Sequence, residues 1–135
     1  MLTEKDYCDY DTCVALKELG YKGISRFFYA TKKSPLRRYS HDQILTSRIA
    51  DAVGHTLAIS LYVAQKWLRE EKHIDVLVYL DDLKGYFSFI RIWEGSWKTF
   101  VNLEERDMGK VTYFANYEEA LSEGVKEAVK ILKEK

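Results

Sequence analysis

The side chains best suited to chemistry in this chain are two cysteines, Cys8 and Cys13, and three histidines, His41, His55 and His73. Thiolates and imidazoles bind zinc or form nucleophilic pairs. The sequence has no Cys-x-x-Cys spacing, no Gly-x-Ser-x-Gly elbow and no glycine-rich phosphate loop. A Cys–His or Ser–His pair can still assemble in space from distant positions. We therefore predict no catalytic residue, metal site or cofactor, and keep a small hydrolase as the third function hypothesis.

The two cysteines are predicted to be free thiols. If one helix held both, their separation of five residues would point them to different faces, and they could not form a disulfide. Cys13 falls on the apolar side of the predicted helix, which favours a place in the core. His73 falls at the end of a predicted helix, where the helix dipole favours a cationic ring without any function.

Three carboxylates at the beginning of the chain, Asp6, Asp9 and Asp11, have the close spacing of a calcium loop. Such a loop also requires a glycine at its sixth position and a glutamate at its twelfth, and both are missing. The same residues suit a helix N-terminus, where acidic side chains accept hydrogen bonds from free amides. We therefore interpret them as capping residues.

Residues 21–40 carry positive charge among aromatic side chains. The segment has no acidic residue and six cations: Lys22, Arg26, Lys32, Lys33, Arg37 and Arg38. Cations that alternate with aromatic rings suit single-stranded nucleic acid, because phosphates pair with the former and bases stack on the latter. The alternative is a solvated hairpin whose rings face the core, and we favour it. Lys32, Lys33, Arg37 and Arg38 are the candidate nucleic-acid contacts.

The composition indicates one folded domain spanning residues 1–135. Hydrophobic residues make up 47% of the 135 residues, which is enough to bury a core without disulfides or metal. The formal net charge is zero, so the chain as a whole has no attraction to nucleic acid or to anionic membranes. No apolar run approaches the roughly 20 residues of a membrane span, and the first residues lack an apolar signal core. We expect a cytoplasmic protein.

The first half of the chain contains helical and extended patterns in turn. A helix is predicted to begin at Asp9 and end at Gly20, followed by a strand over residues 24–30 and a loop or hairpin tip over residues 31–40. Residues 41–59 fit a helix that Ser40 or Asp42 would cap and that Gly54 would end, or else an ordered loop. A clearer helix follows from Ser60.

In the second half the hydrophobic period changes from 3.6 to 2. Four strands are predicted, at residues 74–80, 86–93, 97–102 and 110–115, and short turns between them indicate an antiparallel meander. Asn116 and Glu119 then form a capping box at the start of the last helix. The predicted fold is α+β: an antiparallel meander of about four to five strands with helices packed on one face.

Three segments together resemble small uncharacterised proteins of bacterial prophages and related mobile elements. They are Asp9–Tyr21, Ala64–Ile74, which carries Gln-Lys-Trp-Leu-Arg-Glu, and Asn116–Leu132, which begins Asn-Tyr-Glu-Glu-Ala. The resemblance implies no activity and no site, and it leaves residues 31–59 outside the match.

The three tryptophans and ten tyrosines exceed what a small core can easily bury. Exposed aromatic residues are typical of protein interfaces. We therefore expect a non-enzymatic phage or mobile-element accessory protein that acts through protein–protein interaction. A homodimer is slightly favoured, with Trp97 and Phe100 as candidate interface residues. Single-stranded nucleic-acid binding through residues 22–39 is the alternative.

Overall fold

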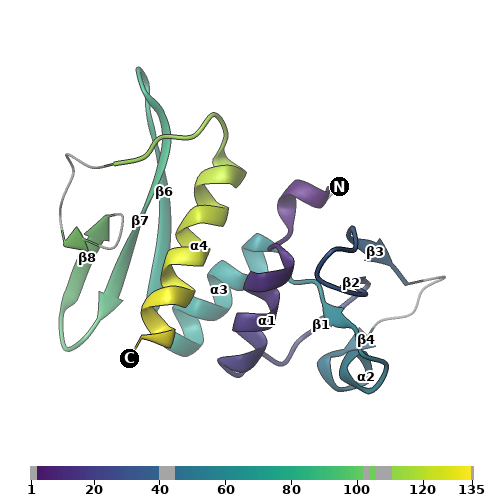
Figure 1. Ribbon diagram of the computed structural model, residues 1–135. Helices are drawn as coiled ribbons and strands as arrows, with labels where there is room; N and C mark the ends of the chain where they lie inside the picture. Colours follow the sequence, from purple (N-terminus) through teal and green to yellow (C-terminus); the bar gives the residue numbers. More distant parts are fainter. Residues whose placement is uncertain (1–2, 40–44, 102–103, 106–110, 135) are drawn as a thin grey trace. The chain divides into compact units, whose positions relative to one another are not determined.

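Figure 1 shows the computed structural model, which describes residues 3–39, 45–101, 104–105 and 111–134. The chain has an α+β fold, as predicted from the sequence. It divides into two compact units, Met1–Ser60 and Leu61–Lys135. The single domain predicted from the chain length stays a prediction, because this division concerns contacts and not independent folding. No helix in the described part of the chain is long and apolar enough to cross a membrane.

The first unit begins with a 3-10 turn, Glu4–Asp6, and helix α1, Tyr10–Glu18. Asp9 caps α1, and its carboxylate accepts a hydrogen bond from the Thr12 amide at 2.8 Å. Gly20 follows the helix with a φ of 107°, a left-handed conformation that favours glycine. Both ends of the helix therefore lie where the sequence predicts them.

Two small antiparallel sheets and one short helix complete this unit. The two-stranded sheet pairs β1 (Ile24–Ser25) with β4 (Leu45–Thr46), and the three-stranded sheet has β2 (Phe27–Tyr29) between β3 (Arg37–Arg38) and β5 (Thr56–Leu57). The hairpin tip predicted within residues 31–40 is the connection between β2 and β3.

The single strand predicted over residues 24–30 is wrong, since these residues contribute to both sheets. The break lies at Arg26, which belongs to neither strand. There the Ser25 hydroxyl accepts a hydrogen bond from the Phe27 amide at 3.0 Å. Because the side chain satisfies this amide locally, the chain can leave one sheet and enter the other.

The uncertain middle segment contains helix α2, Ser47–Ala52. The Thr46 hydroxyl caps it by accepting a hydrogen bond from the Ile49 amide at 3.3 Å. The predicted caps, Ser40 and Asp42, lie outside the described residues, and the observed helix begins too late to use them. Gly54 follows the helix with a φ of 75°, as its predicted role at the end requires.

The second unit is a four-stranded antiparallel meander with two helices. Its elements are α3 (Leu61–Lys72), β6 (Ile74–Asp81), β7 (Gly85–Trp93), β8 (Trp97–Val101), β9 (Glu104–Glu105) and α4 (Tyr117–Lys133). The strand order is β6-β7-β8-β9. Helix α4 packs along β6 and β7, and α3 packs on β6 and α4.

Close packing of α4 on the sheet depends on Gly124. A Cβ atom at this position would lie 2.5 Å from Cγ1 of Val76 and 3.0 Å from Cβ of Ser88. Val76 lies on β6 and Ser88 on β7, in neighbouring register pairs. The helix backbone therefore lies directly against the hairpin. The helix begins at Asn116, whose side-chain oxygen accepts a hydrogen bond from the Glu119 amide at 2.9 Å.

The strand predicted over residues 110–115 is wrong for its described part, which holds a single bridge between Phe114 and Tyr86. The amide of each residue donates to the carbonyl of the other, at 2.9 and 2.7 Å. On the side of Asn116 the chain cannot extend this ladder, because Asn116 already caps α4. The fourth strand is instead β9, which lies between the third and the fourth predicted strands.

Candidate functional site

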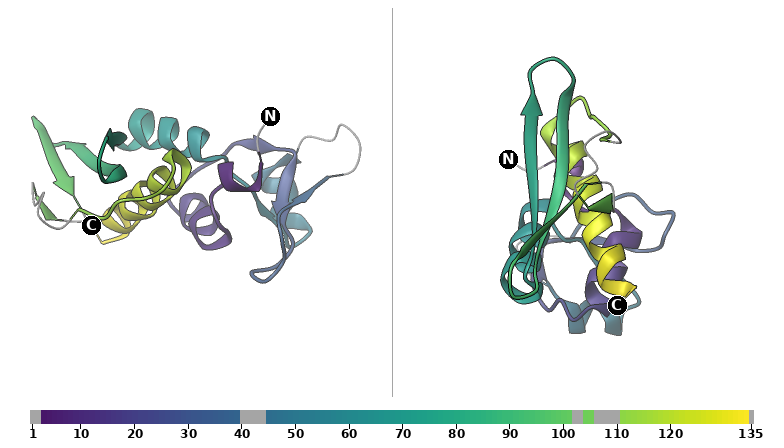
Figure 2. Two further views of the ribbon diagram at one scale, coloured as in Figure 1. Left: turned by 90° about the horizontal axis from the view of Figure 1, so that it is seen from above. Right: turned by 90° about the vertical axis from the view of Figure 1, so that its left-hand side faces the viewer.

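The two faces of the meander differ in what covers them. Successive residues of a strand point to opposite faces, and the close approach of Gly124 shows that Val76 and Ser88 face α4. Ile74, Ile90 and Ile92 share their side of the sheet and are fully or almost fully buried. Figure 2, right, looks onto the opposite face, with α4 behind the sheet.

Large apolar side chains cover that opposite face. The register places Leu77 opposite Phe89, Tyr79 opposite Phe87 and Trp93 opposite Trp97. We call these six residues the aromatic sheet face. Tyr79 is 51% exposed, Trp93 48% and Trp97 42%, and the other three residues are partly exposed. The aromatic sheet face is therefore apolar and open to solvent.

The rings of this face form two groups, and the rings within each group are in direct contact. Tyr79 and Phe89 are stacked, with centroids 5.0 Å apart and planes at 6°, and Phe87 lies 6.1 Å from the Tyr79 ring. Trp93 and Trp97 meet edge to face at 5.3 Å. Contacts between rings hold each side chain in place, so less conformational entropy is lost when a partner covers them.

Charged groups of both signs surround the rings. The guanidinium of Arg91 lies over the Trp97 ring at 5.1 Å, and the ammonium of Lys84 lies over the Tyr113 ring at 5.6 Å. Asp75 is the register partner of Arg91 and lies 3.8 Å from Arg69. Asp81 accepts hydrogen bonds from two amides of the β6–β7 turn. The border of the face is thus close to neutral.

The interface residues predicted from the sequence belong to the same strand, β8. Trp97 is part of the aromatic sheet face and is exposed. The side chain of Phe100 lies outside what the structure describes, and its backbone partner is Ile90, which belongs to the side of the sheet that faces α4. Leu77 and Tyr79 are not among the interface residues predicted from the sequence. Their alternation with the buried positions of β6 is the signal that would have found them.

The four candidate nucleic-acid contacts lie on and beside the β2–β3 hairpin, and all four side chains are exposed. Lys32 lies 3.7 Å from Asp11. The nearby rings serve the fold: Phe28 and Tyr29 are buried, and Phe28 stacks on Tyr39 at 4.1 Å and on His55 at 4.5 Å. Phe28 and Tyr29 are therefore not available for stacking on bases beside these cations.

Cys8 and Cys13 are in contact, and they do not lie on different faces of one helix. Cys8 precedes the Asp9 cap and is not part of α1, so the argument that one helix separates the two cysteines does not apply. The Cys13 thiol donates to the Cys8 carbonyl at 3.6 Å, and Tyr29 donates to the same carbonyl at 2.7 Å. Hydrogen bonding to Cys13, together with burial, raises the pKa of the Cys8 thiol well above its usual value. Both cysteines are free and buried, which favours a structural role.

Among the described residues that could do chemistry, His55 and Asp6 have structural partners. His55 shares a 2.8 Å hydrogen bond with the Tyr39 hydroxyl. His73 follows α3 in a left-handed conformation with a φ of 57°, and His41 lies outside the described residues. Asp6 accepts a hydrogen bond from the Thr3 amide at 2.7 Å. Within the described ranges, no three His, Cys, Asp or Glu side chains are grouped so that they could hold a metal ion.

Comparison of the chain with protein-family models, curated proteins and solved structures finds no match. The resemblance to proteins of prophages and mobile elements stays a prediction. The aromatic sheet face, which rests on register, exposure and ring contacts, is thus the strongest candidate for a functional site.

Proposed function

We propose that this protein is a non-enzymatic accessory protein that acts by binding protein through the aromatic sheet face, and that its first partner is a second copy of itself. The observation that supports the proposal is two groups of rings on one sheet face, with three of the rings between 42% and 51% exposed. Covering such a surface removes apolar area from water, which is the main driving force of protein association.

The ring geometry favours protein over single-stranded nucleic acid. Bases bind by stacking on ring faces that are free. Tyr79 and Phe89 cover one face of each other, and Arg91 lies over Trp97. Both cations and carboxylates border the surface, so it offers phosphates little net attraction.

A second copy suits this surface for two reasons. A two-fold interface brings the same patch of both copies together, so a patch with charges of both signs can pair with itself. The formal net charge of the chain is zero, so no long-range repulsion opposes association. Pairing along the β6 edge is hindered, because the Gln65 side chain donates to the Val76 carbonyl at 2.7 Å.

Substitution of exposed rings tests the proposed surface. We expect Tyr79→Ser combined with Trp97→Ser to raise the dimer dissociation constant by roughly 30-fold or more, because central aromatic residues dominate interface energies. Light scattering coupled to size-exclusion chromatography, at a series of concentrations, measures the change.

Tyr62→Ser is the matched control, since Tyr62 is a 37% exposed tyrosine of α3 outside the aromatic sheet face. The control should dimerise like the unsubstituted protein, and circular dichroism should show all variants folded. A folded Tyr79→Ser/Trp97→Ser variant that dimerises like the control would reject this surface.

A further inference from the structure

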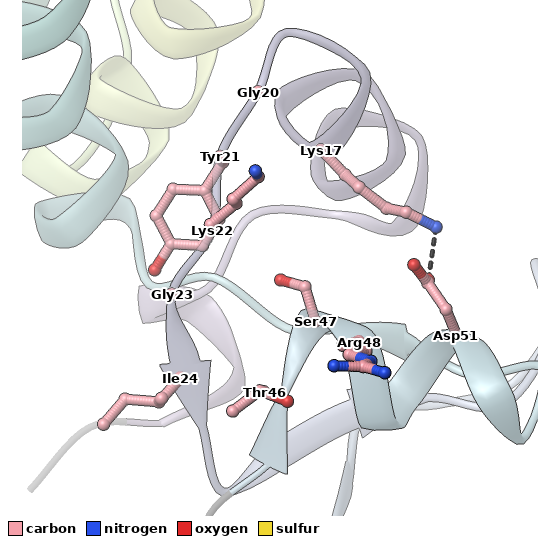
Figure 3. A pocket seen from close by; sticks show the side chains of 10 residues that line it. All are labelled: Lys17, Gly20, Tyr21, Lys22, Gly23, Ile24, Thr46, Ser47, Arg48 and Asp51. Carbon is pink, nitrogen blue, oxygen red and sulfur yellow. Dashed lines mark hydrogen bonds and ion pairs between the residues drawn. The ribbon is translucent and has the colours of Figure 1, made fainter.

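A cavity of about 830 Å³ lies wholly within the first unit, between the loop that follows α1 and the start of α2 (Figure 3). Its size falls in the range of pockets that hold small organic ligands. Tyr21 and Lys22 line it from the loop, Ile24 from β1, and Ser47 and Arg48 from α2, and most of the lining is apolar. None of these residues belongs to the aromatic sheet face.

Two glycines shape the loop wall. Gly20 lets the chain reverse after α1, and its amide donates to the Lys17 carbonyl at 3.0 Å. The ring of Tyr21 then turns back and is only 7% exposed. A Cβ atom on Gly23 would lie 2.0 Å from the Tyr21 hydroxyl oxygen, so any other residue here would require the Tyr21 ring to shift. The conformation of the loop that carries Lys22 therefore depends on these two glycines.

The charges at the cavity leave an excess of positive charge. Lys17 and Asp51 form an ion pair with each other, as Figure 3 shows. Lys22 and Arg48 stand on opposite walls, and neither forms an ion pair with a described residue. The Ser47 hydroxyl lies between the walls and adds a hydrogen-bond donor. Burial, with smaller contributions from Cys13 and Cys8, raises the pKa of Tyr21, so its phenol stays neutral beside an anion.

We propose that this cavity binds a phosphate-bearing small molecule of nucleotide size. The Lys22 ammonium, which points away from Arg48 in Figure 3, turns towards it so that both cations contact the phosphate, and Ser47 donates a hydrogen bond to it. The Tyr21 ring and Ile24, which is 62% exposed, cover the apolar body of the ligand. The two cations alone would bind only the phosphate, and the apolar wall alone would bind only the apolar body. The ligand therefore needs both a phosphate and an apolar body.

Titration calorimetry with adenosine 5′-monophosphate, adenosine and inorganic phosphate tests the site. We expect the monophosphate to bind saturably with a dissociation constant below 1 mM, as is usual for such contacts. Adenosine and inorganic phosphate should each bind at least tenfold more weakly. Arg48→Gln and Lys22→Gln should each weaken binding of the monophosphate by about tenfold or more, because each removes a charged hydrogen bond.

Lys33→Gln is the matched control, an exposed cation of the same unit outside the cavity. It should leave the affinity unchanged. The proposal is overturned if none of the three probes binds saturably up to 5 mM, or if both cavity variants bind the monophosphate as the control does. Equal affinity for adenosine and its monophosphate would also overturn it, because the phosphate would then contribute nothing.

Discussion

At the scale of single residues, burial changes the ionisation of one carboxylate. Glu127 lies half-buried on α4, one turn after Glu123 and three residues before Lys130. Burial raises the pKa of Glu127 to about 7, Glu123 adds to this effect, and Lys130 opposes it. The native state therefore holds a proton at this site between pH 4.5 and 7, whereas the unfolded chain does not.

This difference makes the stability of the protein depend on pH. Because the native state binds the proton more tightly, the contribution of Glu127 to the free energy of unfolding falls as pH rises from about 4.5 to about 7. We expect Glu127→Gln to stabilise the protein at pH 8 and to have a smaller effect at pH 5. Urea denaturation at both pH values measures this, with the exposed Glu70→Gln as control. An equal effect at both pH values would contradict the raised pKa.

At the scale of elements, the structure agrees with the sequence where local signals and burial coincide. Asp9 and Asn116 begin α1 and α4 as predicted, and the period of 2 over β6 and β7 is confirmed by their register. The prediction and the structure disagree where the formation of a strand depends on the segment that pairs with it. The break at Arg26 and the strand β9 depend on which distant segment lies alongside, and no local pattern carries that information.

The contact of α4 with the sheet predicts an unusual effect of a glycine-to-alanine change. Alanine normally favours a helix over glycine by up to about 1 kcal/mol. At position 124 the new methyl group would collide with Val76 and Ser88, so we expect Gly124→Ala to destabilise the protein by about 1–3 kcal/mol. Chemical denaturation tests this against Ser122→Ala on the same helix. A more stable Gly124→Ala variant would show that the helix does not lie this close to the hairpin.

The β2–β3 hairpin carries the prediction about nucleic acid. Its cations are exposed but its rings are buried or stacked, so binding should rest on charge alone. We expect a labelled single strand to bind no more tightly than about 10 μM at physiological salt, and any binding to weaken steeply as salt rises. Fluorescence anisotropy tests this, and replacing Lys32, Lys33, Arg37 and Arg38 by serine should abolish the signal. Submicromolar binding would make nucleic-acid recognition the better account.

At the scale of the whole molecule, the candidate site illustrates what sequence can predict. The surplus of aromatic residues and the exposure of Trp97 follow from composition and period. The aromatic sheet face itself depends on the register that places Tyr79 beside Phe89 and Trp93 opposite Trp97. The cavity of the first unit was not predicted, because it forms where Lys22 and Arg48, 26 positions apart in the chain, line the same space.

The most direct test of self-association is sedimentation equilibrium of the unsubstituted protein from low micromolar to tens of micromolar. Two copies that cover each other's aromatic sheet face should give a mass that rises with concentration from 15.9 kDa towards twice that value. The association should persist at high salt, because apolar burial drives it and ion pairs at the border do not. A mass that stays at 15.9 kDa throughout this range would contradict the account.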